Sequence, residues 1–295
     1  ESKALLKTVA KERIREEFFK ILNNSDSSKI VRELHEKGIL SEFFPFIDWF
    51  KEIDKEYPEY VDLGNHSLDT LMYLEKLIKR IEKGEFAHSE KIKYVLEKEI
   101  VPEHSIKSLL KIASLLHDIG KPETLSFEGK RMRFFNHELE GSKHASNYLK
   151  ELKLSGKEVE IVENLIVQHM RPHNLSSVPE LTPRSMYRFF RDTGDLGIPL
   201  LFLALADAYA TRKCKMGELK EYEQFVNTMI DYFFKPKEVQ SKPLIDGCEI
   251  MELLALKPSP KVGEILEDLK EAQALNVVKT KEEAENYIIS KYKVE

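Results

Sequence analysis

The sequence predicts an all-α fold with one small β-hairpin, and three observations support this prediction. The 295 residues include only 12 glycines and 12 prolines, while 42% are hydrophobic and 33% are charged, a composition typical of a helix-rich protein. Apolar side chains recur every three or four residues through most of the chain, which is the spacing of amphipathic helices. The stretch from Leu125 to Phe134 instead alternates apolar and polar side chains around a Glu-Gly-Lys turn, which is the pattern of a hairpin.

A chain of this length is long for one hydrophobic core, so we expect two or three packed units. We divide it into a helical N-terminal segment (residues 1–60), a central helical domain (61–235) and a helical C-terminal tail (236–295). Prolines and glycines punctuate the tail, so we expect only short helices there, around 250–256 and 262–275.

The composition limits the possible classes of protein. A formal net charge of −5 argues against a basic surface that coats nucleic acid, so any RNA contact would be a local patch. No apolar run approaches the length of a membrane span, and the first residues are charged, unlike a signal peptide. We therefore expect a soluble, cytoplasmic protein with no membrane partner. Cys214 and Cys248 lack metal-ligand spacing, which indicates reduced thiols.

The N-terminal segment predicts two helices. Residues 3–22 carry apolar side chains at helical spacing among many charges. The second helix follows the capping residues 26–28 and ends at Gly38, before an apolar joint at 39–45. The charged face of the first helix is typical of a solvated surface, and RNA binding is the alternative interpretation.

The central domain is expected to open with a helix that starts at Asn65 or Ser67 and places His66 in its first turn. Residues 82–104 are polar and rich in lysine and glutamate, which predicts a surface excursion with a short helix.

The most informative helix follows, over residues 105–118. Its apolar positions predict a buried helix with His117 and Asp118 at its end, and Gly120 and Pro122 are expected to stop the helix. A carboxylate beside so much hydrocarbon costs several kcal/mol unless a cation meets it. A divalent metal ion is such a partner, and imidazole and carboxylate are ligands it accepts. The alternative is a helix-terminal histidine that the helix dipole favours.

Two further helices bring more histidines. After the hairpin, Asn136 caps a helix in which His137, Gly141 and His144 share one face, and Gly141 leaves room for another backbone or a ligand. The next helix, over residues 157–170, carries His169 near its end.

The last helices of the central domain bring a basic stripe and a buried acid. A helix led by Pro183 presents Arg184, Arg188 and Arg191 on one face, which would either guide a polynucleotide backbone or pair with surface acids. The helix from Pro199 to Ala210 is apolar on every side except at Asp207. Asp207 is therefore a buried acid that needs a partner: a metal ion or, alternatively, a following cation, Arg212 or Lys213.

Together these side chains supply enough nitrogen and oxygen ligands for one octahedral metal ion and for a second one beside it. Each histidine alone would more often be a satisfied core residue. The candidate ligands, in chain order, are His66, His117, Asp118, His137, His169 and Asp207.

This order resembles the HD superfamily of metal-dependent phosphohydrolases: a histidine, then His-Asp-Ile-Gly-Lys, then two histidines, then an aspartate within Ala-Asp-Ala. The likeness is closest to bacterial tRNA nucleotidyltransferases (CCA-adding enzymes) and poly(A) polymerase relatives that carry an HD domain. It implies an HD-type helical core flanked by helical N-terminal and C-terminal segments. Four segments carry this closer likeness: 10–18, 136–142, 188–195 and 251–266.

The sequence departs from that family at one point. Nucleotidyl transfer there needs a head domain with a Gly-Gly motif followed by paired carboxylates, and this sequence contains no Gly-Gly. We therefore expect its chemistry to come from the HD site. The alternative interpretation is a split or truncated nucleotidyltransferase, with this chain as its C-terminal portion.

The resemblance also implies roles for individual residues. His66, His117, Asp118 and Asp207 would hold one metal ion, and Asp118 would bridge to a second ion held by His137 and His169. The metal would be Mn, Fe, Ni, Co or Mg, with one or two ions bound. Asp118, Lys121 and Arg171 would form the catalytic group, because Lys121 and Arg171 are placed to neutralise phosphate charge. The alternative for these two cations is a helix C-terminal position that favours positive charge.

Three functions remain open at this point. The first is a phosphohydrolase acting on phosphomonoesters, nucleotides, 2′,3′-cyclic phosphates or RNA ends. The second is an RNA-binding or tRNA-binding body of a nucleotidyltransferase, with a non-catalytic HD site. In the third, the metal only stabilises the helical core.

Overall fold

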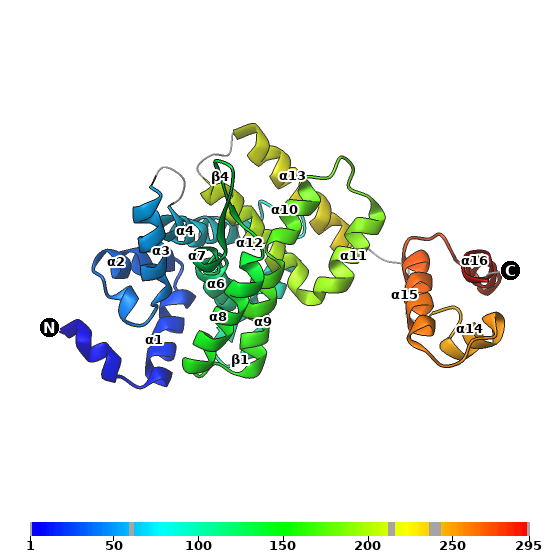
Figure 1. The fold of residues 1–295 in the computed structure, drawn as a ribbon, viewed down its shortest axis with the longest axis horizontal. Coiled ribbons are helices and arrows are strands. Elements are labelled where there is room, and N and C mark those ends of the chain that lie inside the picture. The colour runs from blue at the N-terminus through cyan, green and yellow to red at the C-terminus, as the bar shows by residue number, and fades with distance from the viewer. Residues whose placement is uncertain (1, 59–61, 212–215, 236–242, 294–295) are drawn as a thin grey trace. The chain divides into compact units, whose positions relative to one another are not determined.

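The computed structural model describes residues 2–58, 62–211, 216–235 and 243–293, and it confirms an all-α fold (Figure 1). Its strands form two small antiparallel pairs within these residues. The pair of β3 (Leu125–Glu128) and β4 (Arg131–Phe134) is the predicted hairpin. The other pair, β1 (Glu99–Val101) and β2 (His104–Ser105), lies in the stretch that was expected to hold only a short helix.

The chain divides into two compact units. The first comprises Glu1–Val178 and Asp195–Asp231, and the second comprises Pro179–Gly194 and Tyr232–Glu295. The predicted boundary at 60/61 lies outside the described ranges, and the one at 235/236 lies at the end of the range 216–235.

The N-terminal part of the first unit differs from prediction in two places. The helix expected over residues 3–22 is broken: η1 (Ser2–Thr8) and α1 (Lys11–Asn23) are separate because Ala10 has an extended backbone, with ψ of 136°. After α2 (Ser27–Glu36) and η2 (Leu40–Glu42), the expected apolar joint continues into α3 (Phe46–Glu56).

A buried ion pair joins this N-terminal part to the central helices. Lys111 of α6 (Ile106–Leu116) and Glu75 of α4 (Leu63–Glu82) lie 3.0 Å apart, Nζ to Oε1, and both side chains are at most 5% exposed. Ser27 and Ser28, at the start of α2, donate hydrogen bonds to the same carboxylate. The three helices are thus fixed to one another by a polar network inside the core.

The central helices form the core that surrounds the candidate site. The helix α4 packs against α6 and α12 (Gly197–Ala210), and α6 packs against α9 (Gly156–Gln168), which pairs with α8 (His137–Glu151). Almost every residue of α6 and α12 is buried, as the sequence predicted. The remaining elements of this unit are α5 (Ser89–Glu97), α7 (Lys121–Thr124), α10 (Met170–Ser176), η3 (Gly194–Leu196) at the boundary, and most of α13 (Met216–Phe234).

The second unit contains α11 (Pro183–Thr193), α14 (Gly247–Leu254), α15 (Pro260–Ala274) and α16 (Lys281–Tyr292). Its last three helices share a core that includes Ile250, Ile265, Leu269 and Ile288. Helix α16 was not predicted. Cys248 is exposed and free, whereas Cys214 lies outside the described residues.

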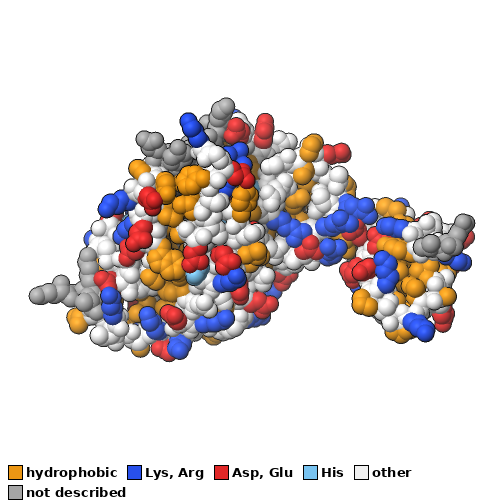
Figure 2. Space-filling view, viewed as in Figure 1, with side chains coloured by type: hydrophobic (Ala, Val, Ile, Leu, Met, Phe, Trp, Pro, Cys, Tyr) orange, Lys and Arg blue, Asp and Glu red, His pale blue; other side chains and the backbone are white. Residues whose placement is uncertain are grey.

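Surface charge and long apolar segments were used above to predict whether the protein contacts nucleic acid or a membrane. On the face drawn in Figure 2, acidic and basic side chains are interspersed over the first unit, so this face is not uniformly basic. In the described part of the chain, one segment of 28 residues, Pro183–Ala210, has the length and composition of a membrane span. The sequence prediction had found no such run. Because 72% of the most apolar 18-residue stretch in this segment is buried inside the fold, the segment is buried as core helices are.

Candidate metal centre

Five separate helix ends or faces deliver the six predicted ligands to one place in the first unit. His66 lies in the first turn of α4, and His117 and Asp118 follow the end of α6. His137 is the first residue of α8, and His169 lies between α9 and α10. Asp207 projects from the otherwise apolar α12. The ligand atoms fall into two groups of three, within which all atoms lie inside 4.8 Å of one another.

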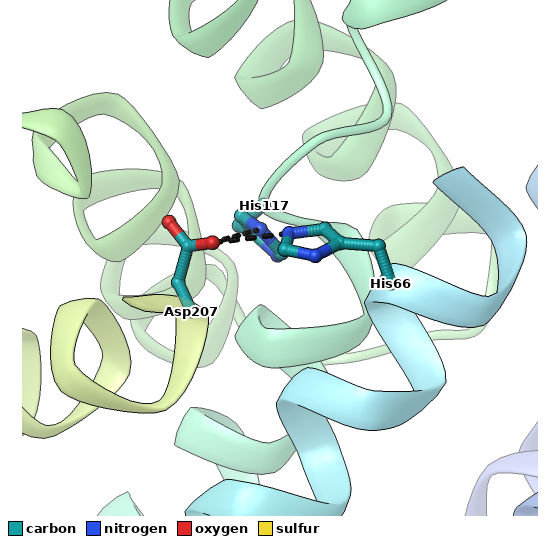
Figure 3. Close-up of side chains that lie close together, drawn as sticks. All are labelled: His66, His117 and Asp207. Atoms are coloured by element: carbon teal, nitrogen blue, oxygen red, sulfur yellow. Dashed lines mark ion pairs between the residues drawn. The ribbon is translucent and has the colours of Figure 1, made fainter. Parts of the chain in front are cut away.

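The first group consists of His66, His117 and Asp207 (Figure 3). The Oδ1 atom of Asp207 lies 3.0 Å from Nε2 of His66 and 3.9 Å from Nε2 of His117. Figure 3 shows both imidazole rings directed at this carboxylate. The group therefore offers two nitrogens and one oxygen to a common point.

The second group consists of Asp118, His137 and His169, all buried. The Oδ1 atom of Asp118 lies 3.4 Å from Nε2 of His137 and 3.8 Å from Nε2 of His169. The two Nε2 atoms are themselves only 3.2 Å apart.

Asp118 lies between the two groups. While its Oδ1 faces His137 and His169, its Oδ2 lies 3.3 Å from Nε2 of His117 and 3.4 Å from Nε2 of His66. Each carboxylate oxygen thus faces a different group, which is the arrangement that a carboxylate bridging two ions requires.

Two glycines allow this convergence. A Cβ atom at Gly120 would lie 2.1 Å from the carbonyl oxygen of His137 and 2.5 Å from the amide nitrogen of Gly141. Only glycine fits so close an approach. The turn that carries Asp118 can therefore pack directly on the first turns of α8, beside His137. The sequence had predicted close backbone approach at Gly141.

The donor atoms fit a bound cation. Three Nδ1 atoms contact backbone carbonyl oxygens: His117 with Ser114 at 3.0 Å, His137 with Phe134 at 2.8 Å and His169 with Ile166 at 2.7 Å. Because a carbonyl only accepts, each Nδ1 must carry the proton, and in the neutral rings each Nε2 presents a lone pair.

The three Nε2 atoms have few partners among the described residues. Nε2 of His117 is buried without a hydrogen-bond partner, and those of His137 and His169 face each other. Metal ions bind such lone pairs, so the residues present suit a divalent metal.

The charges in the cluster stabilise two ionised acids. Burial opposes ionisation of Asp118, but His117, Lys121 and His137 outweigh it and hold the pKa of its carboxyl well below the usual range. Burial likewise opposes ionisation of Asp207, but hydrogen bonds with His173 and His66 hold its pKa well below the usual range. Both acids are thus carboxylates at neutral pH.

The histidines respond according to their neighbours. Burial and the adjacent His117 lower the pKa of His169 to about 3, so its ring is neutral. For His66 and His137, burial lowers the pKa, but Asp207 in the first case and Asp118 in the second outweigh it, and both pKa values are raised. A neutral imidazole is the form that binds a metal ion.

The two predicted phosphate-binding cations, Lys121 and Arg171, contact different side chains. Nζ of Lys121 lies 2.5 Å from Oδ2 of Asp118 and 5.6 Å from the centre of the Phe134 ring, so it borders the metal ligands. Arg171 donates to Oε1 of Gln168 at 3.3 Å, beside His169.

The arginine stripe lies in the second unit, where it meets an acid. Arg184, Arg188 and Arg191 all pair with Glu271 of α15, a carboxylate that is 2% exposed. These contacts favour the alternative interpretation, in which the arginines pair with acids, but Glu271 is buried, whereas surface acids were expected.

Sequence reasoning missed one residue of the site. Nε2 of His173, on α10, lies 2.9 Å from Oδ2 of Asp207. The spacing of four residues from His169 was the available signal, since it often places two side chains on one helical face. Arg212 and Lys213, the alternative partners of Asp207, lie outside the described residues. His144 faces elsewhere, toward Glu123 at 2.9 Å.

Fold and site together define an all-helical protein with a buried histidine–carboxylate cluster suited to divalent cations. The chain matches the HD domain family over residues 63–212, and it belongs to that family. Residues 1–50 match a second family, described as the probable RNA and SrmB-binding site of polymerase A. The predicted resemblance is confirmed.

Curated relatives extend the likeness over nearly the whole chain. A CC-adding tRNA nucleotidyltransferase of Thermus thermophilus is 28% identical over 282 residues, which are 95% of this chain and 56% of the relative. An A-adding tRNA nucleotidyltransferase of Deinococcus radiodurans is 28% identical over 280 residues, 94% of this chain and 57% of the relative. A CC-adding tRNA nucleotidyltransferase of Geobacter sulfurreducens is 25% identical over 288 residues, 97% of this chain and 56% of the relative. This chain therefore spans little more than half the length of each of these relatives.

Proposed function

We propose that this chain is a metal-dependent phosphohydrolase that cleaves phosphomonoesters or phosphodiesters of nucleotides, 2′,3′-cyclic phosphates or RNA ends. The supporting observation is the pair of three-residue groups between which Asp118 lies, together with the buried, unpaired Nε2 of His117 beside it. A site that only stabilised the core would be expected to pair its buried polar atoms within the protein.

The six predicted ligands would divide between two ions. His66, His117 and Asp207 would hold one, His137 and His169 the other, and Asp118 would contact both. A bound divalent ion, such as Mn, Fe, Ni, Co or Mg, supplies Lewis acidity and lowers the pKa of a bound water toward neutrality.

The protein's own cations would bind the substrate. Lys121, whose Nζ lies 2.5 Å from Asp118, would neutralise the charge of a phosphoryl group brought to the cluster. Its cation also restrains Asp118 in the geometry that faces both groups. Arg171, beside His169 in the chain, would be a second phosphate contact.

The direct test is a hydrolysis screen of the metal-loaded protein against phosphomonoesters, cyclic phosphates and short RNAs. We expect hydrolysis that is lost in Asp118→Asn and weakened in Lys121→Ala. The control is His144→Ala, because His144 contacts Glu123 and is outside both ligand groups. A metal-loaded protein that hydrolyses nothing in the screen would contradict the proposal.

A second candidate function is tRNA binding with a non-catalytic HD site. It is favoured by the match of residues 1–50 to an RNA-binding family and by the tRNA nucleotidyltransferase relatives. If the metal-loaded protein bound tRNA tightly but hydrolysed no phosphoester, this function would replace the first. If Asp118→Ala lowered only thermal stability, the metal would serve the core alone.

A further inference from the structure

The two oxygens of Asp207 have different neighbours. Oδ1 faces the histidines of the first ligand group, at 3.0 Å from His66 and 3.9 Å from His117. Oδ2 contacts Nε2 of His173 at 2.9 Å. In Asp118, by contrast, both oxygens face predicted ligands.

His173 is itself held in place by its surroundings. It belongs to α10, its side chain is 22% exposed, and its ring centre lies 5.2 Å from that of Tyr222 on α13. Its backbone carbonyl accepts hydrogen bonds from the hydroxyls of Ser176 and Ser177, at 2.8 and 2.9 Å. The imidazole thus lies on a hydrogen-bonded helical turn and packs against the ring of Tyr222.

We propose that His173 is a positioning residue for the metal centre: its Nε2–H donates to Oδ2 of Asp207, so that only Oδ1 is presented to His66 and His117. The proposal rests on the proposed function, because it assumes that the cluster binds metal. A hydrogen bond to Oδ2 orients the carboxylate and disfavours chelation through both oxygens.

This role explains why two buried aspartates in one cluster differ. Asp118 faces one ligand group with each oxygen, as a bridging ligand does, and Lys121 contacts its Oδ2 without turning that oxygen away from His66 and His117. Asp207 is limited to a terminal, one-oxygen contact. Partners that hydrogen-bond to ligating carboxylates commonly change metal affinity by about 10–100-fold when removed.

The test compares His173→Ala with His173→Gln by calorimetric titration of Mn²⁺ into metal-depleted protein. We expect two binding events in the wild type. In His173→Ala, one of them should weaken by about 10–100-fold while the other stays unchanged. Glutamine can donate from its amide to Oδ2, so His173→Gln should recover most of the lost affinity.

His144→Ala is the matched control, since His144 also pairs with a carboxylate, Glu123, at 2.9 Å, but outside the cluster. Circular dichroism of each metal-free variant checks that it is folded. Unchanged Mn²⁺ affinity in His173→Ala would overturn the proposal. Loss of one ion in both the alanine and the glutamine variants would also overturn it, because His173 would then be a ligand.

Failure of this proposal is distinguishable from failure of the proposed function, because the titration measures binding and not turnover. A wild type that binds two ions but hydrolyses nothing would contradict the phosphohydrolase and leave the role of His173 intact. A wild type that binds no Mn²⁺ would overturn both.

Discussion

Two of the regions that bury carboxylates in the first unit differ in how those carboxylates are paired. Glu75 is paired entirely within the protein: Ser27, Ser28 and Lys111 donate to it. Lys111 in turn donates to the carbonyls of Leu22 and Asn24, at 2.7 and 3.0 Å. The six-ligand cluster around Asp118 instead leaves Nε2 of His117 without a hydrogen-bond partner among the described residues.

The two regions differ in whether their buried polar atoms are all paired within the protein. A buried polar network with every group paired fixes a fold, as the Glu75 network does for α2, α4 and α6. The cluster around Asp118 has an unpaired imidazole nitrogen beside two carboxylates, which suits the bound metal ion that we propose. Substitutions in each region, metal addition and acidification should therefore affect stability to different extents.

Breaking the Glu75 network should cost the most. Lys111→Met leaves the Glu75 carboxylate buried without its cation, and removal of one partner of a buried pair costs about 3–5 kcal/mol. Urea unfolding of the metal-free protein measures this loss. The double variant Lys111→Met/Glu75→Leu should recover much of it, since no charge then remains buried. A loss below about 1 kcal/mol in the single variant would contradict this prediction, because it would mean that the pair contributes no more than a surface salt bridge.

Metal binding should have the next largest effect. At about 100 times the dissociation constant, one bound ion raises the free energy of unfolding by about 2.7 kcal/mol. We expect Mn²⁺ to give at least this gain, EDTA to reverse it and Asp118→Asn to abolish it. Lys111→Met should keep the gain, because Lys111 lies outside the cluster. Equal gains in Asp118→Asn and in the wild type would contradict the assignment.

The Glu75 network should also produce an acid dependence of stability. Burial raises the pKa of Glu75, but hydrogen bonds from Ser27 and Ser28 and the charge of Lys111 outweigh it, and the pKa is lowered. A carboxyl with a lowered folded-state pKa stabilises the fold above its unfolded-state pKa, about 4.3. That contribution is lost as the pH falls through the folded-state pKa.

The difference in urea midpoint between the wild type and Glu75→Gln should therefore be constant above about pH 5 and shrink at lower pH. A difference that grew on acidification would have the wrong sign for this account.

The smallest effect is expected inside the metal cluster. His117→Leu removes the unpaired Nε2 together with the hydrogen bond from Nδ1 to Ser114. A hydrogen bond of this kind contributes about 1 kcal/mol, and loss of an unpaired buried atom offsets part of it. Because Lys121 and His137 still face Asp118 in this variant, the metal-free variant should differ from the wild type by less than about 1.5 kcal/mol by urea unfolding. A cost as large as that of Lys111→Met would show that the cluster, too, holds the fold.

The sequence was most informative where chemistry and periodicity coincide. The helix of residues 105–118 was predictable because an apolar run ends in His117 and Asp118, and the structure brings together all six predicted ligands. Asp207 was predictable because it interrupts an otherwise apolar helix.

Other features depend on contacts that periodicity does not encode. His173 was missed because its partner, Asp207, lies 34 residues away. Lys111 is buried because Glu75 and two carbonyls, from other helices, receive its ammonium group. The break at Ala10 and the start of α4 at Leu63, ahead of the expected Asn65, are local backbone choices at helix ends.

An anomalous-scattering map of crystals grown with Mn²⁺ would locate bound ions in the cluster. We expect one peak among His66, His117, Asp207 and Oδ2 of Asp118, and a second among His137, His169 and Oδ1 of Asp118. A map from a metal-saturated crystal with no peak at either position would contradict this expectation.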